Sequence, residues 1–176
     1  MGTIAELAVP TTEFALHQTL ETVPDAEVEV ERVAAHGEGQ LMPFLWVRTE
    51  DFEAFEVALA EDPSLADVEC LSTFETERLY RTRWVDSPDC VRAVLENDST
   101  ILSATGSEEC WRLRILFPDR DALSRTYEFC EENDLSIDIQ RIYNVDRGKQ
   151  GRFGLTDEQE ETIAAAYEYG YYDVPR

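Results

Sequence analysis

Two long stretches of the chain carry the same order of strand and helix patterns. The clearest strand covers residues 26–35, where Val28 and Val30 alternate with glutamates, as expected for a half-buried strand. In the first stretch the patterns fall at residues 3–10 (strand), 12–23 (helix), 26–35 and 41–48 (strands), 51–62 (helix) and 66–74 (strand). In the second they fall at residues 78–85 (strand), 87–97 (helix), 100–106 and 110–117 (strands), 119–134 (helix) and 135–145 (strand).

The repeated order β-α-β-β-α-β is that of the ferredoxin-like split β-α-β unit. We therefore predict an α+β fold made of tandem ferredoxin-like repeats, residues 1–75 and 76–146, joined by the tight link at 75–78. The usual strand order of such a unit is 4-1-3-2. It predicts two separate antiparallel sheets, each with its own first and third strands side by side in the centre.

The end of the chain has a different character. Residues 147–154 contain three glycines and the only lysine, a composition that favours a hinge. Residues 155–176 read as one helix, with Thr156 and Gln159 as a capping box and Gly170 and Pro175 as stop signals. A single amphipathic helix cannot bury its own apolar face, so we expect it to belong to a larger unit.

The charge balance limits the partners that the chain accepts. It has 38 acidic residues against 15 basic ones, of which 14 are arginine, and a formal charge of −23. This acid-rich, lysine-poor composition is typical of a hydrated anionic surface adapted to high salt. It excludes a broad basic surface for nucleic acid. No apolar run is long enough to span a bilayer and no basic segment opens the chain, so we predict a cytoplasmic protein with no membrane contact.

Few residues are candidates for catalysis or metal binding. The only histidines, His17 and His36, have no paired ligand nearby, and no nucleophile or phosphate-loop motif occurs. We predict no catalytic residues, no metal, no cofactor and no enzyme activity. Cys90 lies in the first turn of a predicted helix, where a thiolate is favoured, so it is a candidate redox residue. The four cysteines, at 70, 90, 110 and 130, otherwise read as small buried residues.

Four arginines form the most informative pattern. Arg81 and Arg83 alternate with apolar or uncharged residues in the strand at 78–85, and Arg112 and Arg114 do the same in the strand at 110–117. If these strands are central neighbours, the four side chains cluster on the helix-free face of the second sheet. A cluster of guanidinium groups needs a neutralising partner.

Two partners for this arginine cluster remain open. One is a set of carboxylates of the first repeat, namely Glu6, Glu27, Glu29, Glu31 and Glu69. The other is a small anionic effector bound between the sheets. We favour pairing within the chain or between the subunits of a homodimer, because charged sheet faces usually meet complementary ones.

The end of the chain resembles the start of the helix-turn-helix domain of bacterio-opsin activator-type regulators of halophilic archaea. Leu155, Thr156 and Gln159 fit the opening of that domain, and residues 170–176, "GYYDVPR", fit its exit. Residues 43–68 and 78–85 are similar to the associated domain that precedes it. The resemblance implies DNA as a partner through helices that follow the first. No DNA-reading residue is expected in this chain, so we expect no sequence-selective DNA binding by residues 1–176.

Three functions are compatible with these features. The first is the regulatory or sensory domain of a helix-turn-helix transcriptional regulator, with residues 155–176 as the first helix of a truncated helix-turn-helix domain. The second is a stand-alone ferredoxin-like module for ligand binding or dimerisation. The third is an enzyme of the dimeric ferredoxin-like barrel type, which requires a walled pocket with a histidine or an acid.

Overall fold

The structure, a computed structural model, describes residues 2–36, 40–85 and 89–145. Its element order is the predicted one. The strands are β1 (Thr3–Pro10), β2 (Glu27–His36), β3 (Gln40–Arg48), β4 (Leu65–Thr73), β5 (Arg78–Trp84), β6 (Thr100–Gly106), β7 (Cys110–Phe117) and β8 (Asp138–Asn144). The helices are η1 (Thr11–Glu13, a 3-10 turn), α1 (His17–Thr22), α2 (Phe52–Glu61), α3 (Asp89–Glu96) and α4 (Arg120–Glu132).

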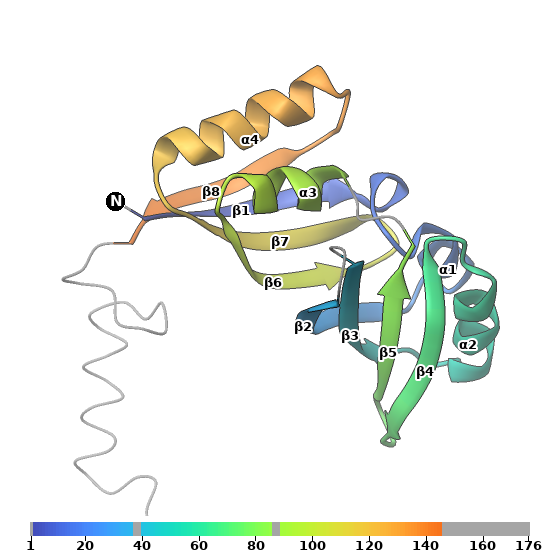
Figure 1. Ribbon diagram of the computed structural model, residues 1–176. Helices are drawn as coiled ribbons and strands as arrows, with labels where there is room; N and C mark the ends of the chain where they lie inside the picture. The colour runs from blue at the N-terminus through green and yellow to red at the C-terminus, as the bar shows by residue number, and fades with distance from the viewer. Residues whose placement is uncertain (1, 37–39, 86–88, 146–176) are drawn as a thin grey trace, which may run out of the picture. The chain divides into compact units, whose positions relative to one another are not determined.

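The strands form a single antiparallel sheet in place of the two that were predicted. Its order is β4-β5-β3-β2-β6-β7-β1-β8 (Figure 1). We call β4-β5-β3-β2 the first half and β6-β7-β1-β8 the second half. The halves join through β2 and β6, where Val28 pairs with Gly106 and Glu29 pairs with Thr105. The α+β class and the antiparallel pairing are confirmed.

The two halves have exchanged their first strands. β1 pairs with β7 from Thr3–Phe117 to Pro10–Cys110, so the first strand of the chain lies in the second half. β5 pairs with β3 and β4, so the strand that opens the second sequence repeat lies in the first half. Each half keeps the 4-1-3-2 arrangement, but its position 1 is filled by the strand of the other repeat. The predicted pairing of first and third strands within one repeat is therefore wrong.

A short hairpin explains the exchange. β4 and β5 are joined by residues 74–77, and a hydrogen bond from the Phe74 amide to the Glu77 carbonyl at 2.9 Å closes the turn around Glu75 and Thr76. A connection this short forces β5 to fold back beside β4, which is the place that β1 was predicted to fill. Because a tight turn closes at a smaller entropic cost than a long loop, this local pairing is favoured, and β1 pairs with β7.

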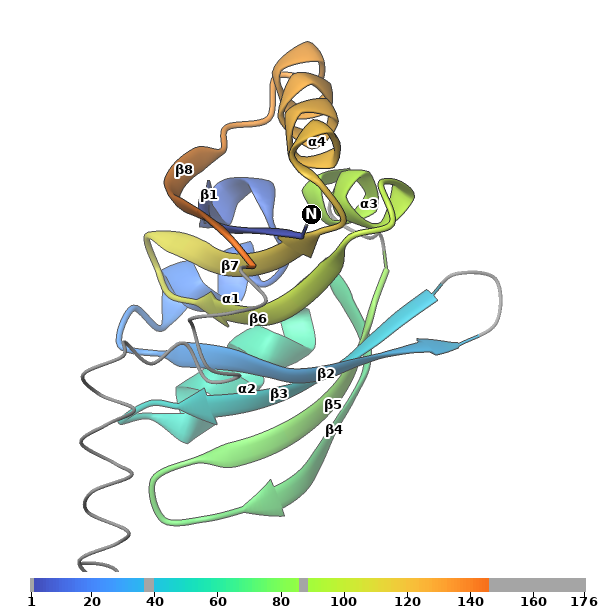
Figure 2. The same cartoon turned by 90° about the vertical axis from the view of Figure 1, so that its left-hand side faces the viewer.

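Helices cover one face of each half and leave the other face open. α1 and α2 lie together beside β4 and β5, and α3 and α4 lie over β6, β7 and β1 (Figure 1). The view in Figure 2 shows the sheet running on from β7 and β6 into β2 and β3. The predicted helix at 12–23 is shorter in the structure, because Leu16 adopts a left-handed conformation (φ 66°) directly before α1.

Large aromatic side chains fill the core where the chain crosses between the halves. The Phe14 ring lies 4.6 Å from Trp111 and 5.8 Å from Trp84, measured between ring centroids. Trp111 is fully buried and donates from Nε1 to the Ala15 carbonyl at 3.1 Å. A Cβ atom at Gly106 would lie 2.6 Å from the Trp111 ring, so only glycine fits there. The core is continuous across both halves.

Some predictions concern residues outside the ranges that the structure describes. They are the hinge at 147–154 and the helix at 155–176, with its Thr156 cap. The domain boundaries at residues 75 and 146 remain sequence predictions. Within the residues described, no helix has both the length and the apolar character needed to cross a bilayer.

Candidate anion-binding face of the sheet

The four predicted arginines all lie on the helix-free face or at its margin, as their alternation indicated. On β5, Tyr80, Thr82 and Trp84 are buried, while Arg81 is exposed and Arg83 is half-buried. On β7, Trp111, Leu113, Ile115 and Phe117 are buried, while Arg112 is exposed and Arg114 is half-buried. The assignment of side chains to faces is therefore confirmed for both strands.

The four arginines do not form one cluster. β3, β2 and β6 separate β5 from β7, because the strand exchange places β5 in the first half of the sheet. The expectation that β5 and β7 are neighbours is wrong. The structure brings Arg81 together with Arg83 and Arg112 together with Arg114, and these two pairs have different surroundings.

The β5 pair is matched by carboxylates of the adjacent strand β4. Arg81 pairs with Glu69, one of the predicted carboxylate partners. Arg83 donates from Nε to Asp67 Oδ2 at 2.7 Å. Asp67 has a positive φ of 52° and lies at an irregularity of β4, which turns its side chain to the arginine. These two arginines are therefore neutralised within the chain.

A third arginine of β5 is engaged at the opposite face. Arg78 donates from Nη1 to Glu56 Oε1 at 2.6 Å, and its guanidinium lies 4.3 Å above the Phe52 ring. Tyr80 donates its hydroxyl to the same Glu56 oxygen at 2.9 Å. Burial, together with this nearby carboxylate, raises the pKa of Tyr80 above its ordinary value of 10.0.

Among the residues that the structure describes, the β7 pair has no carboxylate partner within ion-pair distance. Arg114 donates from Nε to the Tyr143 hydroxyl at 2.9 Å, and this hydroxyl donates in turn to Glu6 Oε1 at 3.3 Å. Within the described part of the chain, neither Arg112 nor Arg114 forms an ion pair. Tyr143 therefore orients the Arg114 side chain through its Nε atom.

A hollow of about 450 Å³ lies over this part of the sheet, and we call it the arginine pocket. Its polar lining consists of Glu6, Ser103, Thr105, Arg112, Arg114, Gln140 and Arg141. Three arginines and one glutamate give this lining a formal charge of +2 in a chain of −23. Sequence reasoning missed Arg141, because its role depends on β8 lying next to the displaced β1.

A second hollow of about 220 Å³ lies where the two halves join, and we call it the junction pocket. Its lining includes Glu27, Glu29, Trp46, Arg48, Thr105, Ser107 and Arg112. Thr105 and Arg112 line both pockets, so the two hollows adjoin on the same face. Sequence reasoning did not predict the junction pocket, since this pocket forms only when β2 pairs with β6.

The other candidate residues show less. Cys90 lies in the first turn of α3, as predicted, and its side chain lies outside the described residues. Burial raises the pKa of the Cys130 thiol, which favours its neutral form over the nucleophilic thiolate. His17 lies 3.8 Å from Glu21 on the same helix. No group of three potential metal ligands occurs among the residues described.

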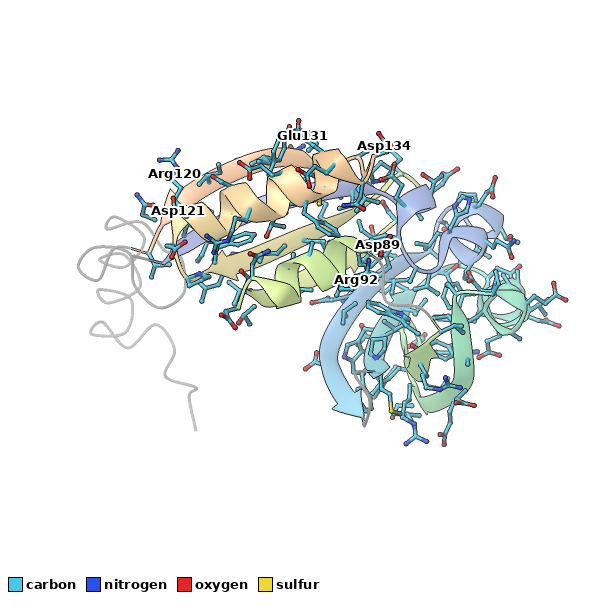
Figure 3. The ribbon with its side chains drawn as sticks, turned by 45° about the horizontal axis from the view of Figure 1, so that its top comes forward. Asp89, Arg92, Arg120, Asp121, Glu131 and Asp134 are labelled. Carbon is cyan, nitrogen blue, oxygen red and sulfur yellow. The ribbon has the colours of Figure 1, made fainter. Side chains whose placement is uncertain are left out.

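The helix-covered side of the second half carries solvated charges. Figure 3 shows Arg120 and Asp121 at the start of α4, Glu131 near its end and Asp134 just beyond it. On α3, Asp89 and Arg92 form an ion pair at 2.6 Å. These side chains are exposed, so this side of the domain has the character of a hydrated surface.

Comparisons with known proteins identify two families. The model of the BAT family, described as "GAF and HTH_10 associated domain", matches residues 3–157. The model of the HTH_10 family, described as "HTH DNA binding domain", matches residues 155–176. A search of curated proteins finds no match. Both families are regulatory or DNA-binding, and neither is an enzyme family. The chain therefore belongs to the BAT family of GAF- and HTH_10-associated domains, and it is a transcription regulator that joins such a domain to a helix-turn-helix domain.

Proposed function

We propose that the described domain is the sensory part of this regulator and that it binds a small anionic effector in the arginine pocket. One observation carries the proposal. Arg112, Arg114 and Arg141 line one hollow, and within the described residues none of them has an ion-pair partner. The proposal includes the cytoplasmic location expected from the sequence, because a regulator that binds DNA must be in the same compartment as the DNA.

The acidic composition makes unpaired arginines informative. Carboxylates outnumber basic side chains by more than two to one in this chain, so a partner for a surface arginine is readily available. Arg81 and Arg83 have such partners, while the arginines of the pocket have none among the residues described. Guanidinium groups held side by side repel each other and bind oxyanions through parallel hydrogen bonds. An anion in the pocket would relieve that repulsion.

The position of β8 suggests how an effector signal would leave the domain. β8 is the edge strand next to β1 in the described sheet, and it carries Gln140, Arg141 and Tyr143. Ten residues, 145–154, lie between its last residue, Asn144, and the start of the HTH_10 match. An effector that contacts Arg141 would order this edge strand. If the effector binds the ordered state of β8 more tightly than a frayed state, it shifts β8 towards the ordered state. The segment that follows β8 would then be held differently with and without the effector.

Anion-dependent stability tests the proposed function. Inorganic phosphate at 100 times its dissociation constant should stabilise the wild type by about 2.7 kcal/mol at fixed molar salt. Arg112→Ala should lose this stabilisation because the variant lacks a central guanidinium of the pocket. Arg81→Ala is the matched control, since it removes an arginine of the same face that already has a carboxylate partner. Equal responses of the two variants would contradict the proposal.

We further propose that the protein is a homodimer that pairs along β4. This strand forms the other edge of the sheet, and exposed apolar side chains lie on it and on the following turn: Val68, Leu71 and Phe74. An exposed apolar edge strand is a site for pairing with a second chain. Light scattering at fixed molar salt should report a dimer for the wild type and a monomer for Leu71→Asp. A monomeric wild type would overturn this assignment.

A further inference from the structure

One row of paired residues connects the two pockets across the sheet. Trp46 of β3 pairs with Glu29 of β2, Glu29 pairs with Thr105 of β6, and Thr105 pairs with Arg112 of β7. All four residues line the junction pocket, and Thr105 and Arg112 also line the arginine pocket. Three strand spacings separate the ends of the row, which gives about 14 Å along it. Glu29, Thr105 and Arg112 are exposed on the helix-free face, and Trp46 is half-buried there.

The end of the row at Trp46 is suited to a flat ring that carries hydrogen-bond donors. Trp46 is half-buried, and its ring lies 5.8 Å from that of Phe74. An indole on an open sheet face is a stacking platform for a planar group. Beside it lie Glu27 and Glu29, which form no ion pair within the residues that the structure describes. Ionised carboxylates accept hydrogen bonds and do not donate them.

The end of the row at Arg112 is suited to a dianion. The arginine pocket carries a formal charge of +2, which a phosphate monoester at neutral pH would balance. At the other end, the junction pocket has Glu27, Glu29 and Arg48 in its lining, and Arg48 is already paired with Glu77 at 3.3 Å, so this end does not favour a second anionic group. A ligand that fills both pockets must therefore have a phosphate at one end and a donor-bearing ring at the other.

We propose that the two pockets form one site for a nucleoside monophosphate whose base carries an amino group. The phosphate lies on Arg112, Arg114 and Arg141, the base stacks on Trp46, and its amino group donates to Glu29. Thr105, between the two ends, faces the sugar. This assignment rests on the proposed anion-binding function and names the class of ligand.

The choice of ligands separates the two proposals. Guanosine 5′-monophosphate and ribose 5-phosphate carry the same phosphate, and only the first carries a base. Titration calorimetry at fixed molar salt should give the nucleotide an affinity at least about tenfold higher, the scale of one base–aromatic stack. Trp84 is 4% exposed and Trp111 is 0% exposed, so a change in tryptophan emission on nucleotide binding reports Trp46.

Two variants locate the base. Trp46→Ala should reduce the affinity for the nucleotide to that for ribose 5-phosphate and leave the affinity for ribose 5-phosphate unchanged. Phe44→Ala is the matched control, since Phe44 is half-buried on the same strand and face but outside the junction pocket. It should keep the tenfold preference.

Each outcome supports or overturns a defined claim. Equal affinities of the wild type for the two ligands would overturn the nucleotide assignment and leave the anion site intact. A tenfold preference that survives in Trp46→Ala would also overturn it, because the base would then lie elsewhere. If neither ligand nor inorganic phosphate binds, both proposals fail.

Discussion

β5 and β7 carry similar alternating arginines on the same face of one sheet, and their arginines have different surroundings. Arg81 and Arg83 lie next to β4, which supplies Glu69 and Asp67. Arg112 and Arg114 lie between β6 and β1, where Thr105, Ser103 and Ala8 are opposite them together with a single acid, Glu6. Alternation along a strand fixes the face on which a side chain lies. The neighbouring strands decide whether its charge is satisfied within the chain.

Trp111→Ala tests whether the two halves of the sheet unfold as one cooperative structure. Removing a fully buried indole from the crossing region should lower the free energy of unfolding by about 3–5 kcal/mol. Because the core is continuous and the first strands are exchanged, both halves should unfold together. Denaturant unfolding followed by circular dichroism and by tryptophan emission should give coincident transitions. Two separated transitions would show that the halves are independent.

Tyr80→Phe tests how much the hydrogen bond between Tyr80 and Glu56 stabilises the first half. It removes the hydrogen bond to Glu56 and should cost about 1 kcal/mol near neutral pH. The folded state raises the pKa of Tyr80, so this contribution is fully present below pH 10, the ordinary value, and is lost as the pH rises above it. Unfolding measured across alkaline pH should show a smaller loss of stability in the variant. If the variant lost stability at alkaline pH as steeply as the wild type, the role given to Tyr80 would be contradicted.

Arg83→Ala and Arg112→Ala contrast the two arginine pairs directly. Asp67 is largely exposed, so breaking its pair with Arg83 should cost only about 0.2–1 kcal/mol. Arg112→Ala should leave the stability of the anion-free protein nearly unchanged, because no ion pair is lost within the described residues. Thermal unfolding at fixed molar salt measures both. A larger loss for Arg112→Ala would show that Arg112 has a structural role.

The sequence predicted elements better than their pairing. The order of strands and helices and the faces of β5 and β7 follow from local periodicity, which the sequence carries directly. The strand exchange is a choice between competing long-range pairings, which periodicity does not encode. The two-residue turn at Glu75 and Thr76 was the available signal, because it forces β5 against β4.

The candidate site was predicted only in part. Arg112 and Arg114 were identified from alternation, but Arg141 and Trp46 join them only through pairings that the exchange creates. The predicted partner Glu69 does neutralise Arg81, whereas Glu27 and Glu29 lie in the junction pocket without an arginine ion pair within the described residues. The sequence therefore predicted which arginines are involved and on which face of the sheet they lie, but not which residues of the neighbouring strands surround them.

Arginine side-chain NMR compares the two regions in one unmodified sample. The chain has 14 arginines, so their Nε–Hε signals can be resolved and assigned. On titration with phosphate at fixed molar salt, the signals of Arg112, Arg114 and Arg141 should shift together along one binding curve. Those of Arg81 and Arg83 should stay in place because their carboxylate partners already hold them. Shifts of equal size at both pairs, or none at Arg112, would contradict the account.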